Sequence, residues 1–326
     1  MGSYRCWLDG KPVDVQVIEP DTAAIEQMIA LIRGRPTRYS WLKLLADSPW
    51  SYLRAVADAI DAGEPEEERL AAKLGAGPGV QRPDALIFGT AVHRMVLGAP
   101  ELVVVFDRAA ADARLPEKDR APDKAAARNG RAWEAFRAEH EELGHTILSP
   151  REYAGARRMA DNILRSDDAC RLLFDGTILE ERILWRLGGL EISSRPDARK
   201  PGEHVTDLKS CVDSSSTAFG RAIFKMLYPA QLECYARAAE AVDGERPGEA
   251  NIVAVDRKRP PRIFLLPPEA LEIGAKCLTA WTERLAGCLA SSNFPFDSHH
   301  VATPPAYLLG ESDITAPDEA WNGELP

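Results

Sequence analysis

Stretches in which apolar and polar residues alternate predict the strands of this protein. The clearest runs from Leu190 to Ser194, and Pro201-Gly202 marks a turn before a second strand that leads into Asp207. We therefore expect a hairpin of two adjacent strands in this part of the chain. The segments with strand character are a small N-terminal hairpin, the region around this motif and two later strands: 5–17, 178–209, 251–256 and 262–266.

Apolar residues that recur at helical spacing predict the helices. The longest helix is expected from Pro268 to Ala290, where an apolar stripe indicates a face turned toward the core. A shorter apolar helix is expected over 88–97, opened by Gly89 and carrying His93. The mixture of helices and strands predicts an α/β fold. The other helices are expected at 22–33, 41–46, 49–62, 129–143 and 150–166.

Changes in composition along the chain predict three regions. Residues 1–75 are expected to form an N-terminal hairpin and helical region, 76–292 the α/β core with a helical insertion, and 293–326 an acidic, proline-rich tail. The polar segment 64–79 is expected to be a linker, because no Gly-Lys-Ser/Thr follows its glycines to complete a phosphate-binding loop. The charged, proline-punctuated segment 107–127 is expected to be an exposed loop.

Two carboxylates and a lysine lie at a spacing that suits metal-dependent phosphodiester chemistry. Arg195-Pro196-Asp197 is followed, after nine residues, by Asp207-Leu208-Lys209. A hairpin would bring both aspartates to neighbouring points of one sheet, and Mg²⁺ or Mn²⁺ prefers carboxylate and carbonyl oxygen. The predicted ligands are therefore Asp197, Asp207 and the backbone carbonyl of Leu208. Lys209 shares a strand face with Asp207, where its ammonium can orient an attacking water. Asp-x-Lys also occurs by chance in ordinary strands, so the motif alone does not establish a site.

Two other segments carry side chains that suit such a site. Pro229 fits the first turn of a helix, and Gln231 and Tyr235, four residues apart, share one face of it. Their amide and phenol groups can reach phosphate oxygens or the motif lysine. His93 is a candidate metal ligand on its apolar helix. The alternative is that His93 and Tyr235 are core residues and Gln231 is a surface residue.

Taken together, Gly-Thr-Ala-x-His, Arg-Pro-Asp, Asp-Leu-Lys and Gln-x-x-x-Tyr resemble the PD-(D/E)XK nuclease superfamily. The likeness is greatest to its RecE (exonuclease VIII)-like and RecB-like branch of phage-type exodeoxyribonucleases, and it covers roughly residues 35 to 290. The resemblance implies a restriction-endonuclease-like core, with a central mixed β-sheet flanked by helices and N-terminal helical additions. It implies an active site built from His93, Asp197, Asp207 and Lys209. The Gln-x-x-x-Tyr helix, with Gln231 and Tyr235 as further candidate catalytic residues, is the marker of this branch.

Glu181 is a further candidate acid under the same resemblance. An acidic residue recurs in that superfamily on the strand before Arg-Pro-Asp, and Glu181 is the matching position here. Glu181 shares a predicted strand face with Ile183 and Trp185, so it can equally be a structural residue at the edge of the sheet.

The net charge of −10 is unusual for a protein that binds DNA, so the placement of the basic residues matters more than their sum. Basic residues gather near the motif, whereas the tail after Gly310 carries acids and neither lysine nor arginine. A charge run of this kind can also be a solvated face. The predicted DNA-binding residues are Arg195, Arg199, Lys225, Arg257, Lys258 and Arg259.

Composition limits the cofactors and the compartment. No apolar run is long enough to span a membrane, and the N-terminus lacks an apolar signal core. Six cysteines without paired spacing predict reduced thiols in a cytoplasm, and Cys277 and Cys288 are too far apart for the iron–sulfur pattern of some relatives. We expect Mg²⁺ or Mn²⁺ as cofactor, no iron–sulfur cluster and no ATP, because no nucleotide-binding loop is present.

The predicted function is a metal-dependent deoxyribonuclease. The resemblance further implies an ATP-independent exonuclease that degrades linear double-stranded DNA ends during recombination or repair in a bacterial or phage-infected cell. It also implies a homo-oligomer and a single-strand annealing protein as partner. Two alternatives stay open at this stage: an endonuclease of the same superfamily, and a DNA-binding or assembly module that does not cleave.

Overall fold

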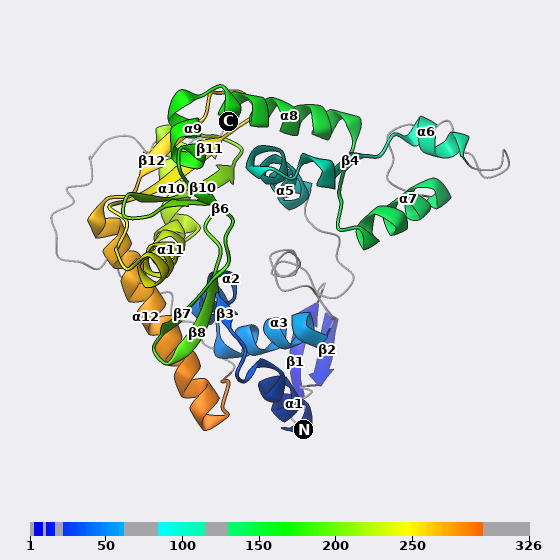
Figure 1. Ribbon diagram of the computed structural model, residues 1–326. Coiled ribbons are helices and arrows are strands. Elements are labelled where there is room, and N and C mark those ends of the chain that lie inside the picture. The colour runs from blue at the N-terminus through cyan, green and yellow to red at the C-terminus, as the bar shows by residue number, and fades with distance from the viewer. Residues whose placement is uncertain (1–2, 9–10, 17–21, 62–83, 115–129, 296–326) are drawn as a thin grey trace, which may run out of the picture. The chain divides into compact units, whose positions relative to one another are not determined.

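The largest sheet of the computed structural model, among the described residues, is a five-stranded mixed sheet with strand order β12-β11-β10-β9-β6 (Figure 1). β10 and β11 run parallel, and the other neighbouring pairs are antiparallel. The structure describes residues 3–8, 11–16, 22–61, 84–114 and 130–295. The strands are β6 (Ile178–Leu179), β9 (Ala198–Lys200), β10 (His204–Ser210), β11 (Glu249–Val255) and β12 (Arg262–Leu265).

A hairpin with its turn at Pro201-Gly202 is present as expected, but its first strand is β9 rather than the predicted strand over Leu190–Ser194. The turn between β9 and β10 holds Gly202 at a φ of +70°, a left-handed conformation that glycine adopts without steric cost. Thr206 pairs with Ala198, so the next positions, Asp207 and Asp197, face each other across the two strands. The local sequence therefore positions the two carboxylates.

The strand over Leu190–Ser194 (β8) does not belong to this hairpin, which corrects the prediction that it pairs with the strand leading into Asp207. β8 lies in a second sheet of order β3-β8-β7, with β3 at Thr37–Arg38 and β7 at Ile183–Leu187. Pro196 has no backbone N–H to donate to a ladder. The chain thus leaves one sheet at Ser194 and enters the other at Ala198.

Helices cover both faces of the five-stranded sheet. Val205 and Ile252 pack against α10 (Ser216–Lys225) and α11 (Tyr228–Asp243). Leu208 and Val253 point the opposite way, because successive strand residues alternate between faces. On that second face lie α5 (Asp84–Leu97), α8 (Pro150–Leu164) and α9 (Asp167–Phe174). The odd-numbered β10 residues Asp207 and Lys209 therefore share the face of α11.

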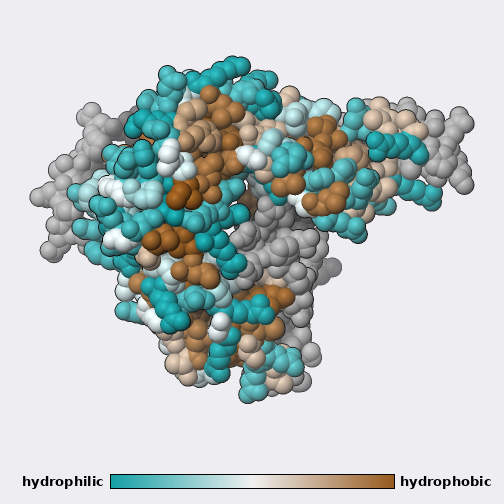
Figure 2. Space-filling model, viewed as in Figure 1, coloured by the Kyte–Doolittle hydropathy of each residue, from teal (hydrophilic) through white to brown (hydrophobic). Residues whose placement is uncertain are grey.

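The sequence of α8 explains where this helix begins. Ser149 accepts a hydrogen bond from the backbone N–H of Glu152, and the Glu152 carboxylate accepts one from the N–H of Ser149 at 2.8 Å. Pro150 occupies the first turn, where a missing N–H costs nothing. Figure 2 shows hydrophilic residues along the upper edge of the view, over α8 and α9, which agrees with the solvent-facing side of an amphipathic helix.

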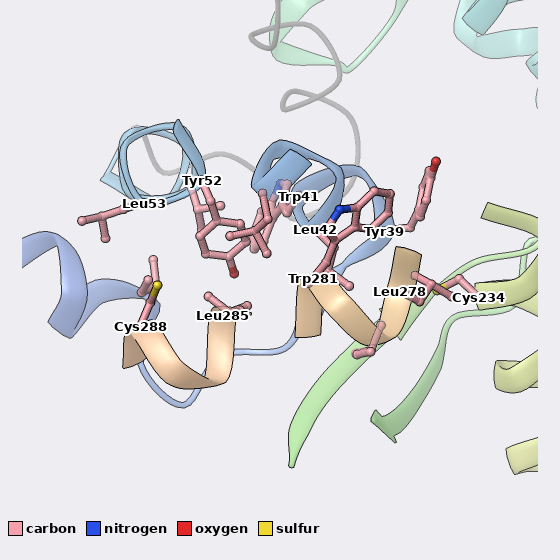
Figure 3. Close-up of a cluster of buried hydrophobic side chains, with 14 of the residues drawn as sticks. Tyr39, Trp41, Leu42, Tyr52, Leu53, Cys234, Leu278, Trp281, Leu285 and Cys288 are labelled. Atoms are coloured by element: carbon pink, nitrogen blue, oxygen red, sulfur yellow. The ribbon is translucent and has the colours of Figure 1, made fainter. Parts of the chain in front are cut away.

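A second core joins the N-terminal helices to the C-terminal helix. Figure 3 shows Leu42, Leu53, Trp281 and Leu285 packed in one cluster. These side chains come from α2 (Tyr39–Leu42), α3 (Pro49–Asp61) and α12 (Pro268–Ser291); α1 (Thr22–Ile32) and the 3-10 helix η1 (Lys43–Ala46) also contribute. α11 serves both cores, since Cys234 faces this cluster and Leu232 faces the sheet.

The remaining described elements are two small two-stranded sheets and three further helices. A two-stranded hairpin is formed by β1 (Ser3–Leu8) and β2 (Lys11–Gln16), and a parallel pair by β4 (Val103–Val105) and β5 (Thr146–Leu148). The three further helices are η2 (Pro100–Leu102), α6 (Arg108–Ala113) and α7 (Gly130–Glu142).

Two helix predictions need correction. Helix α5 begins at Asp84 rather than at Gly89, and α6 forms a helix where an exposed loop was expected from residue 107. Most of that predicted loop, the 64–79 linker and the tail from residue 296 lie outside the described residues, so these predictions stay untested. The proposed region boundaries also remain predictions. No described helix has the length and apolar character needed to span a bilayer.

The contact between α11 and α12 depends on a glycine. A Cβ added at Gly274 would lie 2.3 Å from the carbonyl oxygen of Pro229, a backbone atom that cannot rotate away. We expect Gly274→Ala to lower the free energy of unfolding by roughly 3 kcal/mol, at the upper end of overpacking costs. Chemical denaturation of both proteins measures this difference.

Gly287, on the same helix, supplies a matched control. No atom lies within 4 Å of a Cβ built there, so Gly287→Ala should stabilise the protein by roughly 0.5–1 kcal/mol through helix propensity. Equal effects of the two substitutions would show that α11 and α12 are not in close contact at Gly274.

Candidate active site

The site lies where β9 ends and β10 continues past it. Asp197 immediately precedes β9, and its Oδ2 accepts a hydrogen bond from the backbone N–H of Leu208 at 2.6 Å. Asp197 and Asp207 are 9% and 1% exposed, so both carboxylates are largely removed from water. The two carboxylates are thus held beside each other, at the part of β10 that continues past the end of β9.

His93 approaches this point from the opposite face of the sheet. Its Nδ1 lies 3.7 Å from Oδ1 of Asp197. One helical turn earlier, Gly89 faces the end of β10, where an added Cβ would be 3.0 Å from Oγ of Ser210. The glycine therefore permits α5 to approach the strand closely, and this brings the imidazole to the carboxylate.

Lys209 forms an ion pair with Oδ2 of Asp207. Its ammonium also lies 5.1 Å from the centroid of the Tyr228 ring, within the range of a cation–π interaction. The carboxylate and the aromatic ring together hold the lysine at the site, on the strand face predicted for it.

Gln231 and Tyr235 reach the site from α11. The Gln231 amide nitrogen donates to the Tyr235 hydroxyl at 2.8 Å and lies 3.4 Å from Oδ1 of Asp207. The pair thus contacts the acid of the motif. Burial raises the pKa of Tyr235 well above its usual value, and the nearby Asp207 and Asp197 raise it further. The phenol therefore stays protonated.

The two charged groups of the motif shift each other's proton affinity. Burial raises the pKa of Asp207 to about 6 although Lys209 opposes this shift, because a buried carboxylate loses its hydration. Burial alone would lower the pKa of Lys209, but Asp207 and Asp197 outweigh it and raise this pKa. We expect the ammonium form of Lys209 to persist at neutral pH.

The donor set suits a hard divalent cation. Oδ2 of Asp207 is buried and, among the residues that the structure describes, has no hydrogen-bond partner besides the ion pair with the Lys209 ammonium. The N–H and C=O of a strand residue point the same way, so the Leu208 carbonyl lies on the Asp197 side of β10, beyond the end of β9. Carboxylate and carbonyl oxygens are the ligands that Mg²⁺ and Mn²⁺ prefer.

The side chains are nevertheless not already arranged as a three-ligand cluster. Within the described ranges, no three His, Cys, Asp or Glu side chains are grouped so that they could hold a metal ion. Lys209 pairs with Asp207, and the Leu208 N–H occupies one oxygen of Asp197. The site therefore fits a divalent cation by the chemistry and the position of its donor atoms. The proposed ligands are His93, Asp197, Asp207 and the Leu208 carbonyl.

Metal affinity should depend on pH through Asp207. A cation binds the carboxylate form, and the raised pKa of about 6 means that Asp207 takes up a proton as the pH falls through that value. We expect affinity for Mn²⁺ to fall about tenfold per pH unit below 6 and to level off above about 7, because one proton is displaced. Isothermal titration calorimetry at pH 5, 6 and 7.5 measures this.

His93→Gln serves as the control, since it removes the imidazole from the proposed ligands and leaves Asp207 in place. The dependence below pH 6 should remain in this variant. An affinity that is the same at pH 5 and pH 7.5 would show that Asp207 is not a ligand.

Two predicted site residues, Arg199 and Glu181, form an ion pair with each other. Arg199 is 3% exposed, and its guanidinium pairs with Glu181 on one side and Asp243 on the other. The burial and this double pairing hold the guanidinium inside the protein and do not favour contact with DNA, so the assignment of Arg199 as a DNA-binding residue stays an untested prediction. Glu181 uses its carboxylate in this ion pair, which supports the structural alternative for that residue.

The other predicted DNA-binding residues lie on the surface in different settings. Arg257 and Lys258 are exposed in the β11–β12 turn, and Arg257 stacks over the Phe88 ring at 4.2 Å. Asp256 organises this turn by accepting backbone hydrogen bonds from Lys258 and Arg259.

Arg259 is held by Asp213 and Asp256 rather than being free to move. Lys225 is exposed in the last turn of α10, and Arg195 is half-buried. Contact of these residues with DNA stays a prediction.

Three residues near the motif were not predicted. Tyr228 lies under Lys209, and Tyr39 and Lys43 reach the adjacent loop from the N-terminal region. A signal was present for Tyr228, which lies three residues before Gln231 and hence on the same side of the helix. No local pattern marks Tyr39 or Lys43, because they approach the site only through packing.

Comparisons with known proteins agree with this geometry. The sequence profile of a family described as "PDDEXK-like domain of unknown function (DUF3799)" matches residues 39–303. Among solved structures, one called "Putative exonuclease" from Eubacterium rectale has a TM-score of 0.50 and 13% identity, and the match covers 89% of this chain and 96% of that one. Another, called SSO0001, has a TM-score of 0.27 and 15% identity, and the match covers 63% of this chain and 85% of that one. This likeness is too weak to indicate a shared fold. A search of curated proteins finds no match.

The profile match includes the motif, α5 and α11, and it extends over well more than half of the chain. The likeness to the Eubacterium rectale structure, at 13% identity, concerns the fold alone. The restriction-endonuclease-like α/β core with a mixed central sheet is thereby confirmed, whereas the RecE-like branch remains a prediction. This chain belongs to the family of PDDEXK-like domains of unknown function.

Proposed function

We propose that this protein is a divalent-metal-dependent deoxyribonuclease that shortens linear double-stranded DNA from its ends without ATP. The observation that supports this most is the placement of Asp197 opposite Asp207, with Lys209 paired to Asp207 at the same point. Two buried acids that can hold a divalent cation, with a lysine beside them, are groups that suit hydrolysis of a phosphodiester. The preference for DNA ends rests on the resemblance to phage-type exonucleases.

A bound Mg²⁺ or Mn²⁺ would be held by Asp197, Asp207, His93 and the Leu208 carbonyl, and would polarise the phosphate and lower the pKa of the attacking water. The protein's own groups then have separate tasks. Lys209 orients that water and stabilises the negative charge that develops on the phosphate oxygens. Gln231 holds Asp207 in place through its amide, and Tyr235 orients Gln231.

The experiment compares two DNA substrates with and without Mg²⁺, in the absence of ATP. End-labelled linear duplex should be degraded, and covalently closed circular DNA of the same sequence should not. Cleavage of both would support an endonuclease instead, and cleavage of neither under any divalent metal would support a DNA-binding module without catalysis. EDTA should stop the reaction, because the site then lacks its cation.

We also propose, on the resemblance alone, that the protein acts as a homo-oligomer in the cytoplasm of a bacterial or phage-infected cell. A single-strand annealing protein is the partner that this resemblance suggests. Sedimentation analysis and co-purification test these two points.

A further inference from the structure

Lys43 reaches the loop beside the candidate active site from the N-terminal region. Its Nζ donates a hydrogen bond to the backbone carbonyl of Met226 at 3.2 Å, across 183 residues of sequence. Four residues earlier, the Tyr39 hydroxyl donates to the next carbonyl, that of Leu227, at 2.6 Å. Two side chains of one short segment therefore hold two consecutive carbonyls of the loop between α10 and α11.

That loop leads directly to the residues of the site. Leu227 has a left-handed φ of 59°, a conformation that is unfavourable for leucine and is kept by the surrounding contacts. The next residue, Tyr228, places its ring 5.1 Å from the Lys209 ammonium. Lys43 and Lys209 thus contact the same short segment, at Met226 and at Tyr228. Burial, followed by the charge of Lys209, lowers the pKa of Lys43.

The charges of the two lysines are balanced differently. Lys209 has the Asp207 carboxylate as partner. Lys43 is half-buried, and within the described residues no carboxylate forms an ion pair with it. Its ammonium donates instead to the neutral carbonyl of Met226. A partly desolvated ammonium beside another cation gains most from an incoming anion. A phosphate of the DNA substrate is an anion of suitable size and charge.

A purely structural role for Lys43 is the alternative. Met226 is the C-terminal cap of α10, and a cation near the last carbonyls of a helix is stabilising on its own. A neutral amide could satisfy the same carbonyl, however, whereas it could not neutralise a phosphate. The two roles therefore predict different outcomes for glutamine and arginine at this position.

We propose that Lys43 binds a phosphodiester oxygen of DNA next to the phosphate that is cleaved. This inference rests on the proposed nuclease function and adds a substrate-positioning residue from outside the Asp207-Leu208-Lys209 motif. The Tyr39 hydrogen bond fixes the segment so that the ammonium faces the loop of the site. Lys43 acts on substrate position, so its loss should raise the substrate concentration needed for half-maximal rate more than it lowers the maximal rate.

Three variants separate charge from shape. Lys43→Gln can still donate to Met226 but is neutral, Lys43→Arg keeps the charge, and Lys276→Gln removes one charge from an exposed lysine on α12. Binding of a fluorescent duplex is measured by anisotropy in Ca²⁺, so that it does not depend on turnover. We expect Lys43→Gln to bind about tenfold more weakly, with a salt-dependence slope reduced by about 1. Lys43→Arg and Lys276→Gln should stay within about twofold of wild type.

Duplexes with a single neutral methylphosphonate test the contact from the DNA side, and wild type alone suffices if Lys43→Gln does not fold. At one position beside the scissile phosphate, the methylphosphonate should lower the affinity of wild type for DNA about tenfold and leave the affinity of Lys43→Gln unchanged. The inference is overturned if no such position exists in wild type, if every position costs the two proteins the same, or if Lys43→Gln and Lys43→Arg bind equally. DNA binding by wild type together with an unaffected Lys43→Gln refutes this inference alone. Failure of wild type to bind DNA at all refutes the proposed function as well.

Discussion

Asp207→Asn is expected to abolish Mg²⁺-dependent DNA cleavage while leaving the chain folded. The carboxylate is 1% exposed, pairs with Lys209 and faces Asp197 across the hairpin, so an isosteric amide removes the charge without leaving a cavity. A neutral amide is a much weaker ligand for a hard cation. We expect cleavage below detection, and affinity for Mn²⁺ reduced at least tenfold at pH 7.5 by titration calorimetry.

The control for this variant is Asp161→Asn. Asp161 lies on α8 in an exposed pair with Arg157, where one ion pair contributes about 0.5 kcal/mol or less. Its cleavage rate should equal that of wild type. Circular dichroism and thermal melting show whether Asp207→Asn is folded, since the substitution leaves the Lys209 ammonium without its carboxylate. Cleavage by a folded Asp207→Asn at the wild-type rate would rule out this active site.

Lys209→Met is expected to slow chemistry by about 10²–10³-fold while DNA binding changes little. The side chain keeps its length and apolar stem but loses the ammonium that would stabilise charge developing on the phosphate. Binding should be nearly unchanged, because one charge is a small part of the total phosphate contact. Single-turnover rates at saturating DNA, together with anisotropy measurements of affinity, separate the two effects.

The opposite pattern is expected for Arg257→Glu combined with Lys258→Glu. Both residues are exposed in the β11–β12 turn, so their reversal should weaken binding and flatten its salt dependence without slowing chemistry at saturating DNA. Arg259 is left unchanged because it pairs with Asp256 and Asp213 and stabilises the turn. If Lys209→Met cleaves bound DNA at the wild-type single-turnover rate, the role assigned to Lys209 is wrong.

One of the basic residues near the site is engaged in ion pairs inside the protein. Arg199 belongs to the interior, where it joins Glu181 before the hairpin to Asp243 at the end of α11. This ion-pair network holds the hairpin against the helix that carries Gln231. The proposed contacts with DNA therefore rest mainly on the cations at the β11–β12 turn and on Lys43.

Local spacing alone determined a large part of the candidate site. The turn at Gly202 and the nine residues between the two aspartates place Asp197 opposite Asp207, because an antiparallel hairpin has a fixed register. Lys209 shares the face of Asp207 because strand side chains alternate, and Gln231 meets Tyr235 because helix residues four apart are neighbours. Such relations follow from backbone geometry and need no knowledge of the rest of the chain.

Only the tertiary structure decided which distant groups meet. Arg199 is buried because Asp243, 44 residues later, comes back to it, and Tyr39 reaches Leu227 across 188 residues. The division into two sheets likewise depends on β3 pairing with β8, far along the chain. Periodicity identifies the face on which a side chain lies but not the element that will cover that face. That choice depends on how all the helices and strands pack together, and it determines whether a charged residue contacts solvent, a partner in the core or the substrate.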